Sequence, residues 1–323
     1  MSTYPRAEWT DVHDGDTWRA LRLDLPAPGP CGLRVEVTGG RRILLRQNGS
    51  AIVAARVAQG MSHVDYLRGD GYRPVVPPVR AEHARRLAQA AGGVEKWAYH
   101  FASTLAASQN GPLHAGRWLL EPSAPRLWLQ EHRHISVEEQ WRDIVVSDPA
   151  GEIDWYLLNG AAVILCLRDL SAADQGRVKA YRKQVRGGTV APILLWWISG
   201  LTSYLLLDGH DRLQACLAEG AAPPVLTLSR LADDAGPDVD LETARHTATA
   251  RHIERAVAHG VPGAAEALIA ERRRFGKALE EQLWAKSTRA WTLPGAVEAW
   301  RSAARAMNST WLAAVDPDSA GHA

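Results

Sequence analysis

Short apolar runs alternate with helical patterns from residue 162 to residue 228, and this order of segments restricts the fold more than any other feature of the chain. The expected strands are 162–167, 190–198, 203–207 and 225–228, and the expected helices are 172–185 and 208–220. The apolar runs are short and bounded by glycine and proline, which is typical of buried strands. Ser171 is placed to cap the first helix and Gly220 to end the second. The segment therefore predicts a small α/β module.

The chain on either side of this module predicts other elements. Residues 33–37 and 42–46 predict two strands joined by a glycine turn, and 81–105 suits two helices that follow a proline-rich linker or domain edge near 73–79. Beyond residue 241 the alanine-rich chain predicts an all-helical unit with Trp284, Trp291, Trp300 and Trp311. We thus expect an α+β fold of four regions: 1–80 mostly β, 81–155 mixed and helical, 156–232 the α/β module, and 233–323 helical.

Charge and cysteine usage narrow the class of protein. Among 323 residues, 37 lysines and arginines nearly balance 36 aspartates and glutamates, so nucleic acid is the least favoured partner. The three cysteines, Cys31, Cys166 and Cys216, are odd in number and far apart, which predicts free thiols in a reducing compartment. Since the sequence shows neither a signal-like N-terminus nor an apolar run of spanning length, we expect a cytoplasmic protein with no membrane partner.

The densest polar chemistry lies between the third strand and the second helix. We call this segment the DGHDR turn: Asp208, Gly209, His210, Asp211 and Arg212. Glycine permits a tight turn, and the free N–H groups of the following helix favour a phosphate or carboxylate. Arg212 could bind a phosphate through two parallel hydrogen bonds, and Asp208 could hold a metal ion or take a proton from a hydroxyl. In the structural alternative, both aspartates cap the helix while His210 and Arg212 stay solvated.

Residues 165–230 resemble the ParB/sulfiredoxin-like superfamily. The shared pattern is a helix, a G-x-x-x-P-I strand, a second strand and a D-G-x-x-R turn that leads into an alanine-rich helix, matched here by Gly188, Pro192, Ile193, Asp208, Gly209 and Arg212. Sulfiredoxins carry a catalytic cysteine where this chain has His210, and chromosome-partitioning members have a G-E-R-R turn and a basic character. The serine-kinase-like members, with D-G-H-H-R, differ from this turn only at Asp211.

This resemblance implies a nucleotide-dependent transferase, foremost a small-molecule kinase acting on an amino-acid-like hydroxyl. It implies ATP or another nucleotide and Mg²⁺ as cofactors, with Asp208 near the metal or the hydroxyl. His210 would be catalytic and would also hold phosphate charge together with Gly209, Asp211 and Arg212. The second carboxylate of such kinases follows their first strand, where this chain has Asp169. The implied partners are a nucleotide and a small-molecule acceptor.

Two other functions stay open at this point. The turn could bind a nucleotide without turnover in a sensing or protein-interaction module, whose tryptophan-rich C-terminal helices bind a protein partner. A DNA-binding or nuclease role would use the arginines at 272–274, although such a run is usually a solvated face. His132 and His134 could share a metal on an expected strand, but no third ligand follows at a telling spacing.

Overall fold

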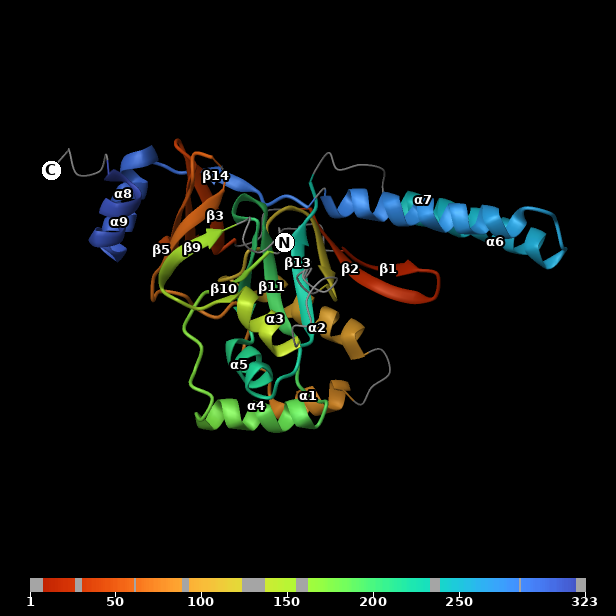
Figure 1. Ribbon diagram of the computed structural model, residues 1–323, viewed down its shortest axis with the longest axis horizontal. Coiled ribbons are helices and arrows are strands. Elements are labelled where there is room, and N and C mark those ends of the chain that lie inside the picture. Colours follow the sequence, from red (N-terminus) through yellow and green to blue (C-terminus); the bar gives the residue numbers. More distant parts are fainter. Residues whose placement is uncertain are drawn as a thin grey trace, which may run out of the picture.

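The computed structural model describes residues 8–26, 31–60, 62–88, 93–123, 137–154, 162–232, 239–284 and 286–317. These residues form two mixed β-sheets with helices on their outer faces, so the chain is an α+β protein, as the sequence predicts (Figure 1). The strands are β1 (Glu8–Asp14), β2 (Thr17–Leu25), β3 (Leu33–Thr38), β4 (Arg42–Gln47), β5 (Ser50–Val57), β6 (His63–Arg68), β7 (Gly116–Glu121), β8 (Val145–Val146), β9 (Ala150–Asp154), β10 (Ile164–Cys166), β11 (Ile193–Ile198), β12 (Ser203–Asp208), β13 (Val225–Arg230) and β14 (Ala290–Thr292). The helices are α1 (Ala81–Ala88), α2 (Gly93–Ala107), α3 (Val137–Ile144), α4 (Gly176–Arg186), α5 (His210–Ala218), α6 (Val239–Ala258), α7 (Ala264–Trp284), α8 (Ala296–Met307) and α9 (Ser309–Val315).

The larger sheet has eight strands in the order β1-β2-β7-β13-β11-β12-β10-β8. Its centre confirms the predicted segment order, because β10, α4, β11, β12, α5 and β13 follow one another along the chain. β10 runs parallel to β12, and β11 is antiparallel to β12 but parallel to β13. On the far side of β13, the antiparallel strand β7 joins this centre to β2 and β1, so N-terminal strands extend the same sheet.

The smaller sheet has six strands in the order β14-β3-β4-β5-β6-β9. The four strands from β3 to β6 form an antiparallel meander, whose first two members are the strands expected at 33–37 and 42–46. β9 closes one edge and pairs with β6, whereas β14 lies parallel to β3 at the other edge. Segments from three parts of the sequence therefore build this sheet.

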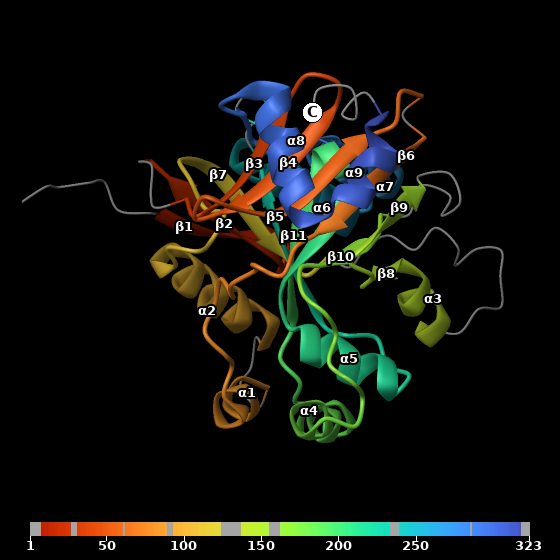
Figure 2. The same cartoon turned by 90° about the vertical axis from the view of Figure 1, so that its left-hand side faces the viewer.

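The two sheets face each other across the main core. The larger sheet contributes Leu120, Leu194, Leu205 and Leu228, the smaller sheet contributes Val35, Leu45, Val53 and Val64, and α2 adds Phe101. α3 and α5 cover the outer face of the larger sheet, where Ile164 and Ile193 of the sheet pack with Leu213 of α5, and α4 packs on α5. α8 and α9 cover the outer face of the smaller sheet through Trp300 and Leu312. Figure 2 shows these layers, with α8 and α9 at the top and α4 at the bottom.

Two sequence-based expectations about the fold are corrected. The C-terminal region is not all helical, because β14 adds a strand to the smaller sheet. Ser171 does not cap a helix: α4 begins at Gly176 after Gln175, and the Ser171 hydroxyl donates a hydrogen bond to Asp211 instead. In the proline-rich stretch near 73–79, Val75 and Val76 are 2% and 3% exposed in the main core, whereas the residues on either side of them are exposed.

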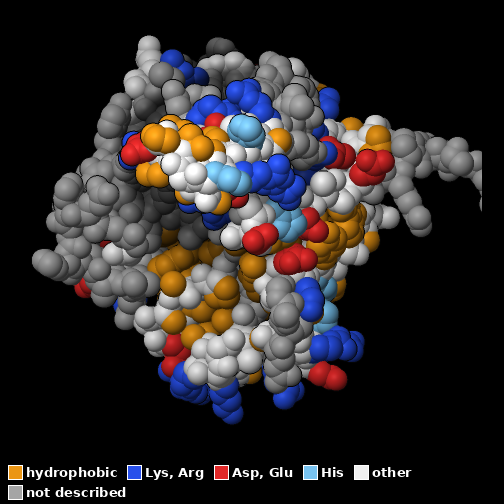
Figure 3. Space-filling view, turned by 90° about the vertical axis from the view of Figure 1, so that its right-hand side faces the viewer, with side chains coloured by type: hydrophobic (Ala, Val, Ile, Leu, Met, Phe, Trp, Pro, Cys, Tyr) orange, Lys and Arg blue, Asp and Glu red, His pale blue; other side chains and the backbone are white. Residues whose placement is uncertain are grey.

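The helices α6 and α7 pair as a long hairpin that extends away from the sheets (Figure 1). Figure 3 looks toward its end, where apolar side chains gather beside basic and histidine side chains. Val257, Val261 and Ile269 are exposed on this hairpin.

Two tryptophans of α8 and α9 stabilise the fold. Trp300 is fully buried and donates its indole N–H to the carbonyl of Ile43, and Trp311 packs against Trp300. Among the described residues, we find no helix that is long and apolar enough to span a membrane.

Candidate functional site

The DGHDR turn connects β12 to α5, as the sequence predicts. Gly209 adopts the left-handed conformation, with φ of +98°, and a Cβ atom built on it would lie 2.9 Å from Cγ2 of Ile193. A larger residue would thus meet both backbone strain and a clash with β11. The close approach of turn and strand buries the next three side chains, and His210, Asp211 and Arg212 are 2%, 5% and 2% exposed. The solvated alternative for His210 and Arg212 is therefore wrong.

Arg212 stabilises the turn through two hydrogen bonds. Its Nη2 donates to Oδ2 of Asp208 at 2.6 Å and to the carbonyl of Pro192 at 2.9 Å. Because this ion pair is 3% and 16% exposed at its two ends, it is partly shielded from water. Arg212, which was expected to bind phosphate, and Asp208, which was expected to bind a metal ion, thus bind each other.

Asp211 is the centre of a second set of contacts. Its Oδ1 accepts hydrogen bonds from Nη2 of Arg168 at 3.1 Å and from the hydroxyl of Ser171 at 2.8 Å. Its Oδ2 lies 3.2 Å from Nε of Arg177, at the start of α4. A carboxylate in the first turn of a helix is favourably placed. Asp211 therefore ties the loop between β10 and α4 to the DGHDR turn.

Beside this loop lies a hollow of about 400 Å³, which we call the arginine cleft. Its polar lining consists of Arg68, Asp70, Arg168, Asp169, Ser171 and Gln175. Arg68 forms an ion pair with Asp169 and donates to the carbonyl of Ser147 at 3.0 Å. The Asp169 side chain is 83% exposed, whereas that of Arg68 is 4% exposed. The cleft therefore has a buried guanidinium group, that of Arg68, and an exposed carboxylate, that of Asp169.

His210 is a neutral group beside several positive charges. Burial lowers its pKa well below the ordinary value, and the nearby guanidinium groups of Arg168, Arg68 and Arg212 lower it further. Its Nε2 atom is buried and has no hydrogen-bond partner among the described residues, and the same holds for Nε of Arg68 and of Arg212. Buried polar atoms are normally paired, so each of these three atoms leaves a hydrogen bond to be supplied by water or by a ligand.

Aromatic side chains from α1 and α2 lie on another side of the turn. The rings of His83 and His100 have centroids 4.7 Å apart, and Trp97 meets both edge-on. Burial lowers the pKa of His100, with a further contribution from His83, while the charge of Asp208 opposes this shift. His100 is therefore electrostatically linked to the strand end that carries the turn.

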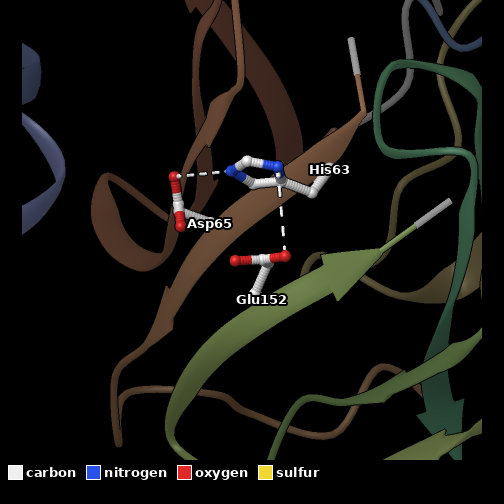
Figure 4. Close-up of side chains that lie close together, drawn as sticks. All are labelled: His63, Asp65 and Glu152. Carbon is white, nitrogen blue, oxygen red and sulfur yellow. Dashed lines mark ion pairs between the residues drawn. The ribbon is translucent and has the colours of Figure 1, made fainter. Parts of the chain in front are cut away.

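A separate cluster of metal-ligating side chains lies on β6 and β9: His63, Asp65 and Glu152 (Figure 4). Nε2 of His63 is 3.8 Å from Asp65, and Nδ1 is 3.9 Å from Glu152. One ligand atom from each of the three residues lies within 4.8 Å of the other two, a spacing that a single metal ion could bridge. This arrangement is that of a histidine between two acids. The pair His132 and His134 lies outside the described residues.

Of the residues predicted for the site, the structure brings Asp169 to the arginine cleft and connects Asp211 to the same loop through Arg168. Sequence reasoning missed Arg68 and Asp70, which come from β6 and the segment after it. The glycines around Asp70 indicated only a turn. The sequence feature that could have indicated this part of the site is Arg68, a charged residue directly after the apolar residues Tyr66 and Leu67 of a strand.

No protein-family model matches the chain, and neither curated proteins nor solved structures contain a match to it. The function of the site therefore has to follow from its geometry and its chemistry.

Proposed function

We propose that the chain is a nucleotide-dependent transferase of the phosphoryl-transfer type, a small-molecule kinase that holds phosphate in the arginine cleft. One observation carries the proposal. Beside the DGHDR turn, buried nitrogens of Arg68, His210 and Arg212 have no partner among the described residues, next to a cleft with two arginines in its lining. Phosphate oxygens are the acceptors that such donors prefer.

The contacts of the cleft suggest which residues would hold the phosphate groups. Arg168 is 38% exposed and pairs with the buried Asp211, which keeps its contacts to Ser171 and Arg177 if Arg168 turns to a phosphate. Arg68 is paired with the exposed Asp169, so its guanidinium group can turn without leaving a buried acid unpaired. The N-terminus of α5 adds a favourable dipole. Arg212 would act differently from its expected role, because it keeps Asp208 and the turn in place. Neutral His210 would donate or accept one hydrogen bond, depending on its tautomer.

ATP and Mg²⁺ are the cofactors that this site would use. Both carboxylates pair with an arginine, but Asp169 fits a magnesium ligand better than Asp208, because its side chain is 83% exposed in the cleft and that of Asp208 is 16% exposed. Magnesium usually binds through one or two carboxylates, phosphate oxygens and water. In the transfer, the bond from phosphorus to the nucleotide's leaving oxygen breaks and a bond to the acceptor oxygen forms. The hydroxyl proton of the acceptor passes to a carboxylate, for which Asp169 and Asp70 are the candidates.

The same proposal includes a relation to the ParB/sulfiredoxin-like superfamily for residues 165–230. It is supported by the order β10, α4, β11, β12, α5 and β13, and by a left-handed glycine between the strand end and the helix. The three cysteines are free and buried, which suits a reducing compartment such as the cytoplasm.

A second candidate function is a nucleotide sensor without turnover. It is favoured by the internal pairing of the turn, where Asp208 binds Arg212, and Asp211 binds Arg168 and Ser171. In such a sensor, phosphate would bind beside the turn and change the contacts of the turn with neighbouring elements. Asp208 would stay paired with Arg212 and would take no part in catalysis.

A thermal-shift screen of ATP, ADP, CTP and GTP, with and without Mg²⁺, tests the proposal, because a ligand of the folded state raises the unfolding midpoint. We expect a shift that Arg168→Gln removes and Arg182→Gln retains. Arg182 is a matched control, since it also pairs with a carboxylate, Glu219, but lies on α4 outside the cleft lining. Absence of any shift would contradict both functions. A shift without turnover over a panel of hydroxyl acceptors would favour the sensor.

A further inference from the structure

The cluster of His63, Asp65 and Glu152 lies on the outer face of the smaller sheet, where the edge strand β9 pairs with β6 (Figure 4). Successive side chains of a strand alternate between the two faces, and the neighbouring residues Val64 and Ile153 are buried in the main core. The three side chains therefore point away from the core, and they are 30%, 28% and 52% exposed. None of them is among the described residues that line the arginine cleft.

The pairing of β6 and β9 brings negative charges together. Asp65 is directly opposite Glu152, and His63 is directly opposite Asp154. Carboxylates at opposite positions of an antiparallel pair repel each other, because their Cβ atoms are only about 4.5–5.5 Å apart. A cation bound between the two strands would turn this repulsion into a shared attraction.

The arginine beside these carboxylates is engaged elsewhere. Arg56 of β5 is the cross-strand neighbour of Asp65 on its other side. Its guanidinium group donates to the carbonyl of Val315 and lies 3.5 Å from Asp316. The charge of Arg56 is therefore directed to the end of α9, and a cation between β6 and β9 would balance the carboxylates there.

The imidazole of His63 is held in a way that suits a metal ligand. The Ser62 hydroxyl lies 3.0 Å from Nδ1, and a hydrogen bond at one ring nitrogen orients a histidine whose other nitrogen binds a metal. That other nitrogen, Nε2, lies 3.8 Å from Asp65. The ligand atoms of the three residues lie within 4.8 Å of one another, whereas those of a tetrahedral zinc ion are about 3.3–3.5 Å apart. Because the side chains are partly exposed, small rotations can close this difference.

The ligand types indicate which ion fits. Imidazole nitrogen suits first-row transition metals, whereas Mg²⁺ and Ca²⁺ prefer oxygen ligands. We propose that His63, Asp65 and Glu152 bind one Zn²⁺ ion, with water in the fourth position. The ion holds the edge strand β9 on β6. This inference does not rest on the proposed function, because the site and the arginine cleft share no described residue.

Titration calorimetry of the full chain with Zn²⁺, after a chelator has removed any metal, tests the site. We expect a bound Zn²⁺ ion that excess Mg²⁺ does not displace, and an affinity at least about tenfold lower in His63→Gln and in Glu152→Gln. The double variant His132→Gln/His134→Gln is the matched control, because it removes two other histidines, and it should bind Zn²⁺ as the wild type does.

Thermal unfolding separates a metal site from a simple ion pair between a protonated histidine and two acids. With Zn²⁺, Glu152→Gln should lower the unfolding midpoint relative to the wild type, because an ion that binds only the folded state stabilises it. With chelator, the same variant should unfold at the wild-type midpoint or above it, since one of two repelling carboxylates is gone. A loss of equal size under both conditions would overturn the proposal. So would an unchanged Zn²⁺ affinity in both site variants, or no saturable Zn²⁺ binding up to the millimolar range.

Discussion

The hydroxyl of Tyr72 donates a hydrogen bond to the carbonyl of Leu207 over 2.5 Å. Leu207 is the residue at which the pairing of β11 and β12 shifts, since Leu194 opposes Asp208 whereas Leu195 opposes Leu206. A bulge of this kind leaves one residue outside the ladder and redirects the strand. Tyr72 therefore supplies the hydrogen-bond donor that β11 does not offer to the carbonyl of Leu207. Leu207 directly precedes the DGHDR turn, whereas Tyr72 belongs to a segment far away in the sequence.

Replacing Tyr72 with phenylalanine should destabilise the fold by about 1–3 kcal/mol, because the enclosed carbonyl of Leu207 loses its donor. Burial, together with the charge of Asp208, raises the pKa of Tyr72, so the hydroxyl remains a donor over the whole accessible pH range. Urea unfolding measures the change. Tyr99→Phe is the control, because Tyr99 donates to Asp11 in a part-buried contact and should cost about 1 kcal/mol or less. Equal losses in the two variants would remove the special role of Tyr72.

Gly209→Ala should cost about 2–5 kcal/mol, since it combines backbone strain with a clash against Ile193. Gly188→Ala separates the two effects: Gly188 also has a positive φ, +64°, but a Cβ atom there meets nothing within 4 Å. We expect this control to lose only about 1–2 kcal/mol. Chemical denaturation of both variants gives the comparison, and a Gly209→Ala loss no larger than the control would contradict the close packing of turn and strand.

Asp316→Asn should cost about 3–5 kcal/mol, because it removes the negative partner from buried arginines. Asp316 is 0% exposed and accepts hydrogen bonds from Arg42 at 2.9 Å and from Arg301 at 3.0 Å, which fastens the end of α9 to the smaller sheet. Asp24→Asn, at a more exposed pair with Arg22, should change stability by about 1 kcal/mol or less. Thermal unfolding of the two variants provides the measurement; similar midpoints would show that the buried pair contributes nothing special.

The α6–α7 hairpin should lose stability in acid. Hydrogen bonds from Arg274 and then from His246 lower the pKa of Glu271 from 4.5 to about 2, against the opposing effect of burial. Because the folded-state pKa is depressed, this carboxylate stabilises the hairpin above pH 4.5, and the stabilisation disappears as the pH falls toward about 2. Helical circular dichroism followed over this range should show a transition that Glu271→Gln weakens. An unchanged acid transition in the variant would refute the assignment.

The α/β module could be predicted from the sequence because its strands are buried on both faces. Four short apolar runs bounded by glycine and proline have few alternatives, and the structure has strands at each of them. Successive side chains of a strand point to opposite faces, and in β11 Trp196 is buried while Trp197 contacts Tyr204. The strand β14 was missed because it is only three residues long and is stabilised by pairing with β3, a partner that no local pattern reveals.

The candidate site was predictable in part for the same reason. The DGHDR turn is local, so its glycine, its charges and its place between a strand and a helix follow from neighbouring residues. Its protonation and its partners do not: the pKa of His210 is lowered first by burial and then by three arginines, one of which, Arg68, belongs to the smaller sheet.

The sequence by itself determined the order of the central elements, the position of the turn and the need for glycine at residue 209. Only the tertiary structure decided that Arg212 pairs with Asp208, that Arg68 and Asp169 meet in a cleft, and that Tyr72 completes the strand before the turn. The physical reason is distance along the chain. Local patterns fix backbone conformation within a few residues, whereas ion pairs and buried hydrogen bonds form between groups that only the packing of the two sheets brings together.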